Sequence, residues 1–376
     1  MNKTKPILLK IVFIFMFIYI FVDLSNSAII GQSNQNRTAV YIMIGLLLIL
    51  TLARLFLSGQ KFLNAIEITL ALMALWIILN NVLLNTFNWA SIIHIGLSLL
   101  WFGLYNFFSR YNYMQEKVCT IFFTIFFLIY VCSLFISSFQ MRDGRDAVLN
   151  TSYYVLIFLP VLLSFSRKKY TVITCALLII GVFWSFKRGA ILAMFFMFFM
   201  YFFVQKKVTK TKNSMLKFIC IATVAISILF ALDNYFGGII LERFSKDNLL
   251  DGSGRKNIYT TAFAYLETCD FATLLIGSGA GTTARILDAS AHNEWIEFIM
   301  CYGLIGVFIY LMLFVALIKQ LHNMIKAKNK NAIYFGIFLA YLFIVGFYGQ
   351  IYFIQSTIFV MSMLGFYSRR SKELVI

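Results

Sequence analysis

Residues 251–297 read DGSGRKNIYTTAFAYLETCDFATLLIGSGAGTTARILDASAHNEWIE and form the one long polar stretch of this chain. Continuous apolar runs flank the stretch on both sides. It carries a glycine-rich run at 277–281 and six charged or titratable side chains of interest: Arg255, Lys256, Arg285, His292, Glu294 and Glu297. A loop of this length is usually either functional or disordered, and its clustered Phe, Tyr, Leu and Ile favour order. We therefore expect a membrane-embedded chain that performs its chemistry at this loop.

The composition indicates an all-α, polytopic membrane protein. Of 376 residues, 61% are hydrophobic and only 12% are charged, with a mean hydropathy of +0.85. Soluble domains carry about 25% charged residues, so the apolar excess is too large for a soluble core. The apolar runs are continuous and about 16–22 residues long, which suits helices crossing ~30 Å of hydrocarbon. A transmembrane barrel would instead show alternating segments of ~10 residues.

Twelve apolar runs predict twelve membrane spans, at 7–24, 38–57, 62–84, 89–108, 117–136, 152–166, 170–186, 189–205, 214–236, 295–318, 332–349 and 352–368. The first run follows basic residues, as in a signal peptide, but its length and the later spans favour an uncleaved helix. The chain then divides into three parts. Residues 1–236 hold nine spans, 237–294 form a long extracytoplasmic loop, and 295–376 hold three spans and a cytoplasmic tail.

The net charge of +17 fits this topology. With a cytoplasmic N-terminus, 22 of the 32 Lys and Arg residues face the cytoplasm, and outside the long loop the count is 22 against 5. Short loops rich in Lys and Arg face the cytoplasm, so we expect both termini there and the long loop outside. Because no soluble basic domain is present, nucleic acid is not an expected partner. The positive charge instead favours anionic lipids and an anionic substrate as partners.

Within the loop, residues 256–267 predict a helix with Ile258, Ala262 and Tyr265–Leu266 on one side, lying along the membrane surface. The run Gly277–Gly281 lacks the Gly-Lys-Ser/Thr of a Walker loop. We expect a tight turn there that brings the backbone close to another group. The six cysteines include no CxxC pair, which favours neither a disulfide framework nor a zinc site.

Two short segments place cations where an outer-face site would need them. Ser185–Ala190 (SFKRGA) sets Lys187 and Arg188 at an outer helix junction, either as an anion clamp or as a tight turn with snorkelling side chains. Gly252–Arg255 (GSGR) precedes the loop helix. It would either cradle phosphate oxygens or simply begin that helix.

The third segment is Ala291–Glu294 (AHNE), where the tenth span begins. Asn293 or Ser290 can cap this helix, and Glu294 and Glu297 suit its first turn. His292 is either a structural residue of the helix start or a general base. In the second case a neighbouring carboxylate would orient its ring and raise its basicity.

Three segments together resemble the bacterial family of O-antigen polymerases (Wzy type) and O-antigen ligases (WaaL type). They are SFKRGA at 185–190, SGR at 253–255 with a helix after it, and the stretch from Gly277 to Tyr310. The most specific part is the His292–Asn293 helix start followed by GLIG at 303–306. Members of this family are polytopic, with one long extracytoplasmic loop near the C-terminal third. The resemblance implies Arg188, Arg255 and His292 as catalytic residues.

The resemblance also implies a glycan donor linked to undecaprenyl diphosphate, in the bacterial inner membrane. Transfer from such a donor needs positive charge on the departing diphosphate and a base for the acceptor hydroxyl. Lys187, Arg188 and Arg255 would supply the charge, and His292 or a nearby carboxylate the base. Further candidates for contact with diphosphate or glycan are Lys256, Arg285, Glu294 and Glu297. No DxD-like metal motif occurs, so we expect a metal-independent glycosyltransferase without a cofactor. A polysaccharide chain-length regulator is a further candidate partner.

Three alternatives stay open. The short segment between the glycine-rich run and His292 favours a polymerase of repeat units over a ligase, which would move finished glycan to a lipid-A core. From another class, a flippase for lipid-linked oligosaccharide would place polar groups at mid-membrane and in paired repeats. Here acidic residues within spans are few, Glu67 being the most central, and no repeat is evident. A non-catalytic scaffold would leave the cations at the outer edge unexplained.

Overall fold

The computed structural model describes residues 5–24, 37–57, 63–110, 116–140, 151–165, 168–242, 244–245, 255–352 and 358–369. All regular structure in these ranges is helical. Seven helices are long and apolar enough to cross a membrane, and five shorter apolar helices occupy the remaining predicted spans. The expected all-α, polytopic fold is therefore confirmed.

Ten of the predicted spans correspond to helices that begin close to the expected residues, and all of these except the one expected at 295–318 also end close to them. These are α1 (Lys5–Leu24), α2 (Arg37–Leu57), α3 (Ala65–Leu83), α4 (Trp89–Arg110), α5 (Glu116–Gln140), α8 (Lys168–Trp184), α9 (Arg188–Thr209), α10 (Ser214–Tyr235), α16 (Glu294–Lys326) and α17 (Asn331–Tyr348). The last span, α18 (Ile358–Ser368), is shorter than expected within the described residues. The long loop holds α11 (Ile239–Glu242), α13 (Arg255–Thr268), α14 (Phe271–Ile276) and α15 (Thr282–Leu287).

The sixth predicted span is two helices, α6 (Thr151–Ile157) and α7 (Leu159–Leu163), which meet at Phe158. Pro160 stands at the start of α7. Because proline has no N–H and its ring clashes with the carbonyl four residues earlier, a continuous helix cannot run through this position. The sequence contains this proline, and the expectation of one helix was wrong.

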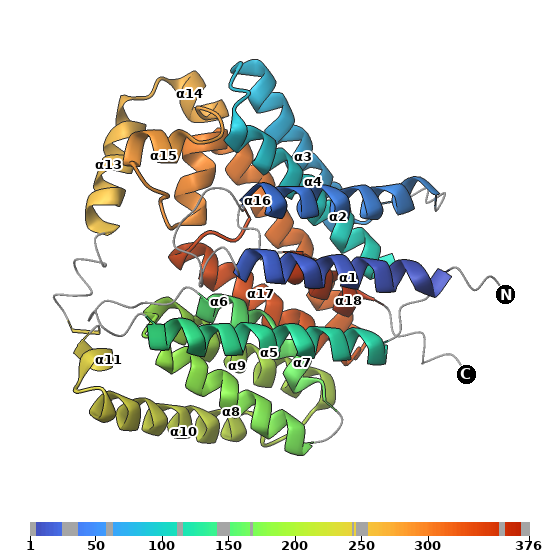
Figure 1. Ribbon diagram of the computed structural model, residues 1–376, viewed down its shortest axis with the longest axis vertical. Coiled ribbons are helices and arrows are strands. Elements are labelled where there is room, and N and C mark those ends of the chain that lie inside the picture. The colour runs from blue at the N-terminus through green and yellow to red at the C-terminus, as the bar shows by residue number, and fades with distance from the viewer. Residues whose placement is uncertain are drawn as a thin grey trace.

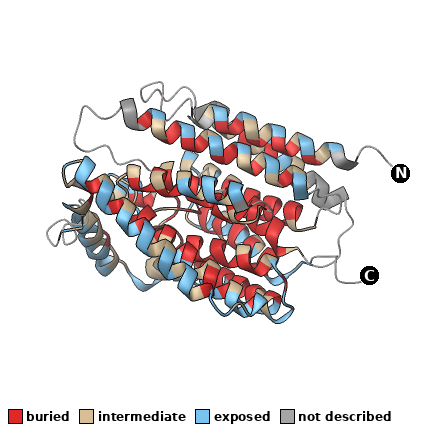
Figure 2. Ribbon diagram, turned by 90° about the horizontal axis from the view of Figure 1, so that it is seen from below, coloured by how far each residue is buried: buried red, intermediate tan, exposed pale blue. Residues whose placement is uncertain are grey.

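The helices differ in how far they are enclosed by the rest of the chain. Over their apolar windows α4 and α17 are 67% buried, whereas α10 is 11% buried. Figure 2 shows the same pattern, with buried residues along the middle of the bundle and exposed ones on the outer helices. Large side chains such as Leu216, Ile219 and Phe230 on α10 are exposed, as expected for a helix that faces lipid.

The helices of the long loop gather at one end of the bundle. Figure 1 shows α11 and α13–α15 on the left of the view, whereas α1 begins on the right. α13 runs across the direction of α1, α5 and α10 rather than along it. The bundle thus has one end that carries the loop helices and an opposite end at which α1 begins.

α16 is a broken helix rather than the straight span expected at 295–318. Gly303 has φ 65° and ψ −169°, in a region that favours glycine, so the helical backbone hydrogen bonds are interrupted there. The freed carbonyl oxygens find other donors. Met300 accepts from the N–H of Ser278 at 3.0 Å, and Cys301 accepts from the N–H of Gly279 at 2.9 Å. The Nε1–H of Trp76 donates to the carbonyl of Tyr302 at 3.0 Å.

The glycine-rich run therefore does bring the backbone close to another group, and that group is the break in α16. A Cβ on Gly277 would lie 2.5 Å from the backbone nitrogen of Gly303 and from the carbonyl of Cys301. Only glycine permits this approach. The contact fixes α14 and α15 against the first part of α16 and so positions the segment that carries His292.

Candidate functional site

Five helix ends lie close together at the loop end of the bundle. They are the starts of α6, α9, α13 and α16 and the end of α17. Gly189, in the first turn of α9, makes the closest of these approaches possible. A Cβ at this position would overlap the hydroxyl of Tyr153 on α6 and would lie 2.9 Å from Cβ of Tyr348 on α17. The glycine of SFKRGA is thus needed for packing at this junction.

Lys187 is half-buried at the N-terminus of α9, where it is the N-cap residue. Its Nζ lies 5.8 Å from the centroid of the Tyr153 ring, in cation–π geometry. Phe186 before it adopts a left-handed conformation with φ 53°, and the Lys187 N–H donates to Oγ of Ser185 at 3.3 Å. This local structure fixes the direction in which α9 begins. Arg188 is the first residue of α9 and is half-buried.

Arg255 is the first residue of α13, and its guanidinium reaches the end of α17. Nη2 donates to the carbonyl oxygen of Tyr348 at 3.1 Å, and Asn293 Nδ2 donates to that of Phe347 at 3.5 Å. The last carbonyls of a helix lack intrahelical donors and carry partial negative charge, so a cation there is stabilised. Within the described residues, the Arg255 guanidinium thus forms a hydrogen bond with a backbone carbonyl and no ion pair with a carboxylate.

His292 lies in the turn before α16 and adopts a left-handed conformation with φ 49°, which is uncommon for a residue other than glycine. Its Nδ1 is 3.3 Å from Oγ of Ser290. The side chain of His292 is exposed, but the surrounding chain removes part of its water and so lowers its pKa, and the positive charges of Arg255 and Lys187 lower it further. Arg255 and Asn293, the neighbour of His292, both donate to the end of α17, and Gly189 beside Lys187 packs against Tyr348 there. The structure thus brings these segments together, and the lowered pKa favours the neutral imidazole of His292.

The expectation that a carboxylate raises the basicity of His292 was wrong, because both glutamates of the segment are engaged elsewhere. Glu294 is fully buried and accepts from the backbone N–H groups of Ile351 and Tyr352. Glu297, 2% exposed, accepts from Oγ1 of Thr283 at 2.6 Å, from the N–H of Ala291 at 2.7 Å and from the side chain of Gln350.

These contacts give the glutamates a structural role. Glu294 ties the start of α16 to the segment that follows α17. Glu297 holds α15 and the turn before α16 in place. The helix start itself is capped by Asn293, whose Oδ1 accepts from the N–H groups of Trp295 and Ile296 at 3.0 and 3.3 Å. Contact of either glutamate with a substrate stays a prediction.

The remaining candidate residues lie outside this cluster or outside the described residues. Arg285 is exposed on α15, with Nη2 3.4 Å from Oγ1 of Thr282. Lys256 is exposed on α13. The packed side of this helix is formed by Ala262 and Tyr265–Leu266 as expected, but with Tyr259 in place of Ile258. Residues 252–254 of the GSGR segment are outside the described residues.

Sequence reasoning missed Tyr153 and the end of α17. Tyr153 lies on α6, 7% exposed, beneath the ammonium group of Lys187. Nothing in its local sequence distinguishes it from the other tyrosines of this chain. The last turn of α17 contributes backbone carbonyls, which no residue type reveals.

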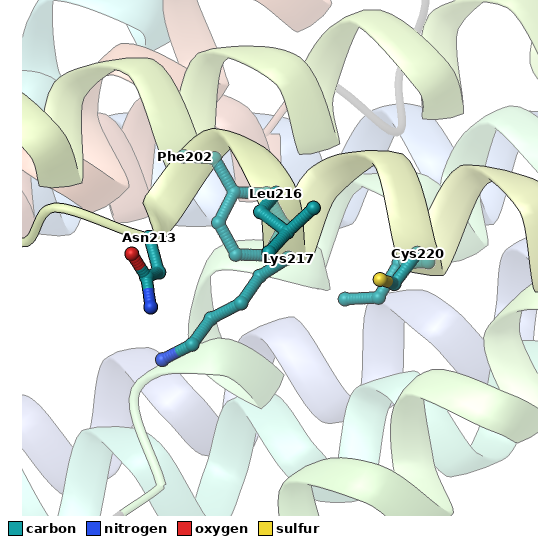
Figure 3. Close-up of a pocket in the computed structure, with 6 residues that line it drawn as sticks. Phe202, Asn213, Leu216, Lys217 and Cys220 are labelled. Atoms are coloured by element: carbon teal, nitrogen blue, oxygen red, sulfur yellow. The ribbon is translucent and has the colours of Figure 1, made fainter.

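An apolar cavity of about 380 Å³ between α9 and α10 is lined by Phe202, Asn213, Leu216, Lys217, Cys220 and Ile221 (Figure 3). Phe202 is 15 residues along α9 from Lys187, which is about 22 Å at 1.5 Å per residue. This cavity is therefore separate from the cluster of Lys187, Arg255 and His292. Within the described ranges, no three His, Cys, Asp or Glu side chains are grouped so that they could hold a metal ion.

In a comparison with protein families, residues 173–311 match the family model described as O-antigen ligase. The match covers 139 of the 376 residues. A comparison with curated proteins finds no match. The matched region runs from α8 through the loop helices to beyond the break in α16, and so contains Lys187, Arg188, Arg255 and His292. The resemblance stated from the motifs is thereby confirmed at the level of the polymerase and ligase family as a whole.

Proposed function

With residues 173–311 carrying a domain of the O-antigen ligase family, we propose that this protein is a glycosyltransferase that polymerises oligosaccharide repeat units linked to undecaprenyl diphosphate. The product is a surface polysaccharide, an O-antigen or a capsule. The observation that carries the proposal is the meeting of the segments that carry Lys187, Arg255 and His292 at the end of α17, at the loop end of the helix bundle.

The cations would hold the diphosphate of the donor. Lys187 and Arg255 come from α9 and α13, and both act on His292 electrostatically. Arg188 follows Lys187 directly and adds a planar donor at the same helix start. A diphosphate whose charge is neutralised leaves without protonation, so the site needs no separate acid. Removal of water from such a site strengthens each of these interactions.

The reaction is a displacement at the anomeric carbon of the donor. An acceptor sugar hydroxyl attacks that carbon while His292 takes the hydroxyl proton. The bond from the anomeric carbon to the diphosphate oxygen breaks, and the diphosphate leaves with the electron pair. A lowered pKa for His292 supports this role, because the imidazole is then neutral at pH 7 and able to accept a proton.

The loop end of the bundle would face the outside of the bacterial inner membrane, with both termini in the cytoplasm. The distribution of Lys and Arg over the short loops supports this orientation. The start of α1 and the loop helices lie at opposite ends of the bundle, which supports this topology (Figure 1). Nucleotide sugars are not expected on that side, which fits a lipid-linked donor.

A ligase is the second candidate, because the matching family model is described by that activity. The polymerase is favoured by the short connection between the glycine-rich run and His292, which contains only the six-residue helix α15. A flippase is less well supported. Glu67, the most central acidic residue by sequence, is the capping-box residue of α3 and pairs with Arg110, so it serves a helix end and not a mid-membrane pathway.

The test is the surface polysaccharide of a strain that lacks this gene, separated on a gel. A polymerase predicts that single repeat units accumulate on the lipid-A core. Unattached polymer on the lipid carrier would indicate the ligase, and lipid-linked units retained on the cytoplasmic side would indicate a flippase. Purified protein with a lipid-linked repeat unit should form polymer in excess chelator. Loss of activity that a divalent ion restores would contradict metal independence.

A further inference from the structure

Tyr153 places a hydroxyl group at the first turn of α9, where it has no hydrogen-bond partner among the described residues. The side chain is 7% exposed, so water does not readily satisfy it. Burying a hydroxyl without a partner costs free energy, and such a group in a folded protein calls for an explanation. The backbone of Tyr153 is well anchored, because its carbonyl accepts from the hydroxyl of Tyr341 at 3.1 Å.

The hydroxyl points at a place that attracts anions. It lies so close to Gly189 that a Cβ on this glycine would overlap it. The N–H groups in the first turn of a helix have no intrahelical acceptor, and the helix dipole adds partial positive charge there. Lys187 stands above the Tyr153 ring, and the charge of Arg255 is within electrostatic range of the hydroxyl.

We propose that the Tyr153 hydroxyl donates a hydrogen bond to an anionic phosphate oxygen bound at the start of α9, between Lys187 and Arg255. This inference rests on the proposed function and adds a binding residue to it. The ring holds Lys187 by its face, and the O–H supplies a neutral, directional donor among the cations. The phosphate oxygen belongs to the departing diphosphate of the donor, and Tyr153 thus positions the leaving group.

Tyr153→Phe tests this, because it removes only the hydroxyl and keeps the ring beneath Lys187. Hydrogen bonds to charged groups contribute about 1.5–3 kcal/mol, which corresponds to about a 10–150-fold weaker binding of the anion. Tyr310→Phe is the matched control. Tyr310 is 1% exposed and its hydroxyl likewise has no partner in the described residues, but it lies within α16.

Binding is measured with farnesyl diphosphate on purified protein in nanodiscs of phosphatidylcholine. We expect the dissociation constant to rise about 10-fold or more in Tyr153→Phe and to be unchanged in Tyr310→Phe. The thermal stability of the ligand-free protein should be equal or higher in Tyr153→Phe, because the hydroxyl makes no bond within the protein. A lower stability with unchanged binding would show a structural hydroxyl and overturn the inference.

Two further outcomes separate this inference from the proposed function. If the wild type binds the diphosphate and Tyr153→Phe binds it equally well, the inference is wrong and the proposed function stands. If the wild type does not bind it, both are wrong. A parallel series in nanodiscs with phosphatidylglycerol distinguishes the source of the phosphate. If this lipid abolishes farnesyl diphosphate binding in the wild type but not in Tyr153→Phe, the site holds a lipid headgroup and the assignment to the donor is overturned.

Discussion

The guanidinium of Arg255 donates a hydrogen bond of 3.1 Å to the carbonyl oxygen of Tyr348, so the residue expected to hold the diphosphate also closes the end of α17. A lysine can replace the hydrogen bond to one carbonyl, but it lacks the planar pair of donors that binds a phosphate. The two roles of Arg255 can therefore be separated by mutation.

We expect Arg255→Lys to retain normal protein levels and thermal stability. The rate of glycosyl transfer should fall about 10–100-fold, because one charge-assisted hydrogen bond to the diphosphate is lost. Arg188→Lys should behave similarly, and Lys187→Ala should be milder. The measurement is polymer formation by purified protein, beside a melting curve. Lys319→Ala, exposed near the other end of α16, is the control. Near-normal polymer from Arg255→Ala would exclude a diphosphate role for this residue.

The pH dependence should report His292. Its neutral form is the base, so the rate rises with pH through the pKa and levels off above it. Burial and the charges of Arg255 and Lys187 lower this pKa below its usual 6.5, so activity should already be on the plateau at pH 7. Lys187→Gln removes one positive charge and should move the midpoint of the rise to higher pH. A midpoint that does not move, or full activity of His292→Asn, would exclude His292 as the base.

The contact between the glycine-rich turn and α16 should be intolerant of side chains. A Cβ on Gly277 meets the backbone at 2.5 Å, and Gly303 has a φ that L-residues disfavour. We expect Gly277→Ala and Gly303→Ala each to cost about 2 kcal/mol or more of unfolding free energy. Gly181→Ala, with nothing within 4 Å of its Cβ, is the control and should be neutral or stabilising. Melting curves in detergent measure all three.

Glu294→Gln and Glu297→Gln should damage the fold before the chemistry. A glutamine keeps one acceptor oxygen, but its amide NH₂ would face N–H groups whose hydrogen bonds the carboxylate now accepts. We expect a loss of about 1–3 kcal/mol for each, seen as a lower melting temperature and reduced protein level. Glu267→Gln, exposed on α13, should show neither change. A wild-type melting temperature with loss of activity would instead place the carboxylate at the substrate.

The orientation of the bundle can be tested with an impermeant thiol reagent in a background that lacks the native cysteines. Lys256 on α13 and Lys328 between α16 and α17 are both exposed, at positions expected to lie on opposite sides of the membrane. Lys256→Cys should react in spheroplasts, and Lys328→Cys only after the membrane is opened. The reverse pattern would contradict both the topology and the proposed location of the site.

The span positions could be predicted from the sequence because hydropathy is local: a run of apolar side chains at helical length needs no partner to be recognised. The broken helices could not be placed so easily. The break at Gly303 depends on the turn at Gly277, 26 residues earlier, which supplies the donors for the freed carbonyls. A glycine in a helix by itself indicates only a weak point.

The candidate site was predicted in part for the same reason. Lys187 and His292 were found because charge at a membrane edge is unusual, whatever surrounds it. The direction of the His292 pKa shift was not predicted, because it depends on which charged residues the fold places near the ring. Neighbours in sequence suggested Glu294, but the fold turns Glu294 toward Ile351 and brings Arg255 and Lys187 instead.

The break in α16 also folds its first part back onto its second part. Trp295 and Phe298, before Gly303, stack on Phe314 and Tyr310 after it, with ring centroids 5.7 and 4.5 Å apart. A membrane of different thickness changes the tilt of the helices that cross it. Any tilt of residues 304–326 is therefore passed through these rings to the turn that carries His292. We expect the rate of glycosyl transfer to depend on the acyl-chain length of the surrounding lipid.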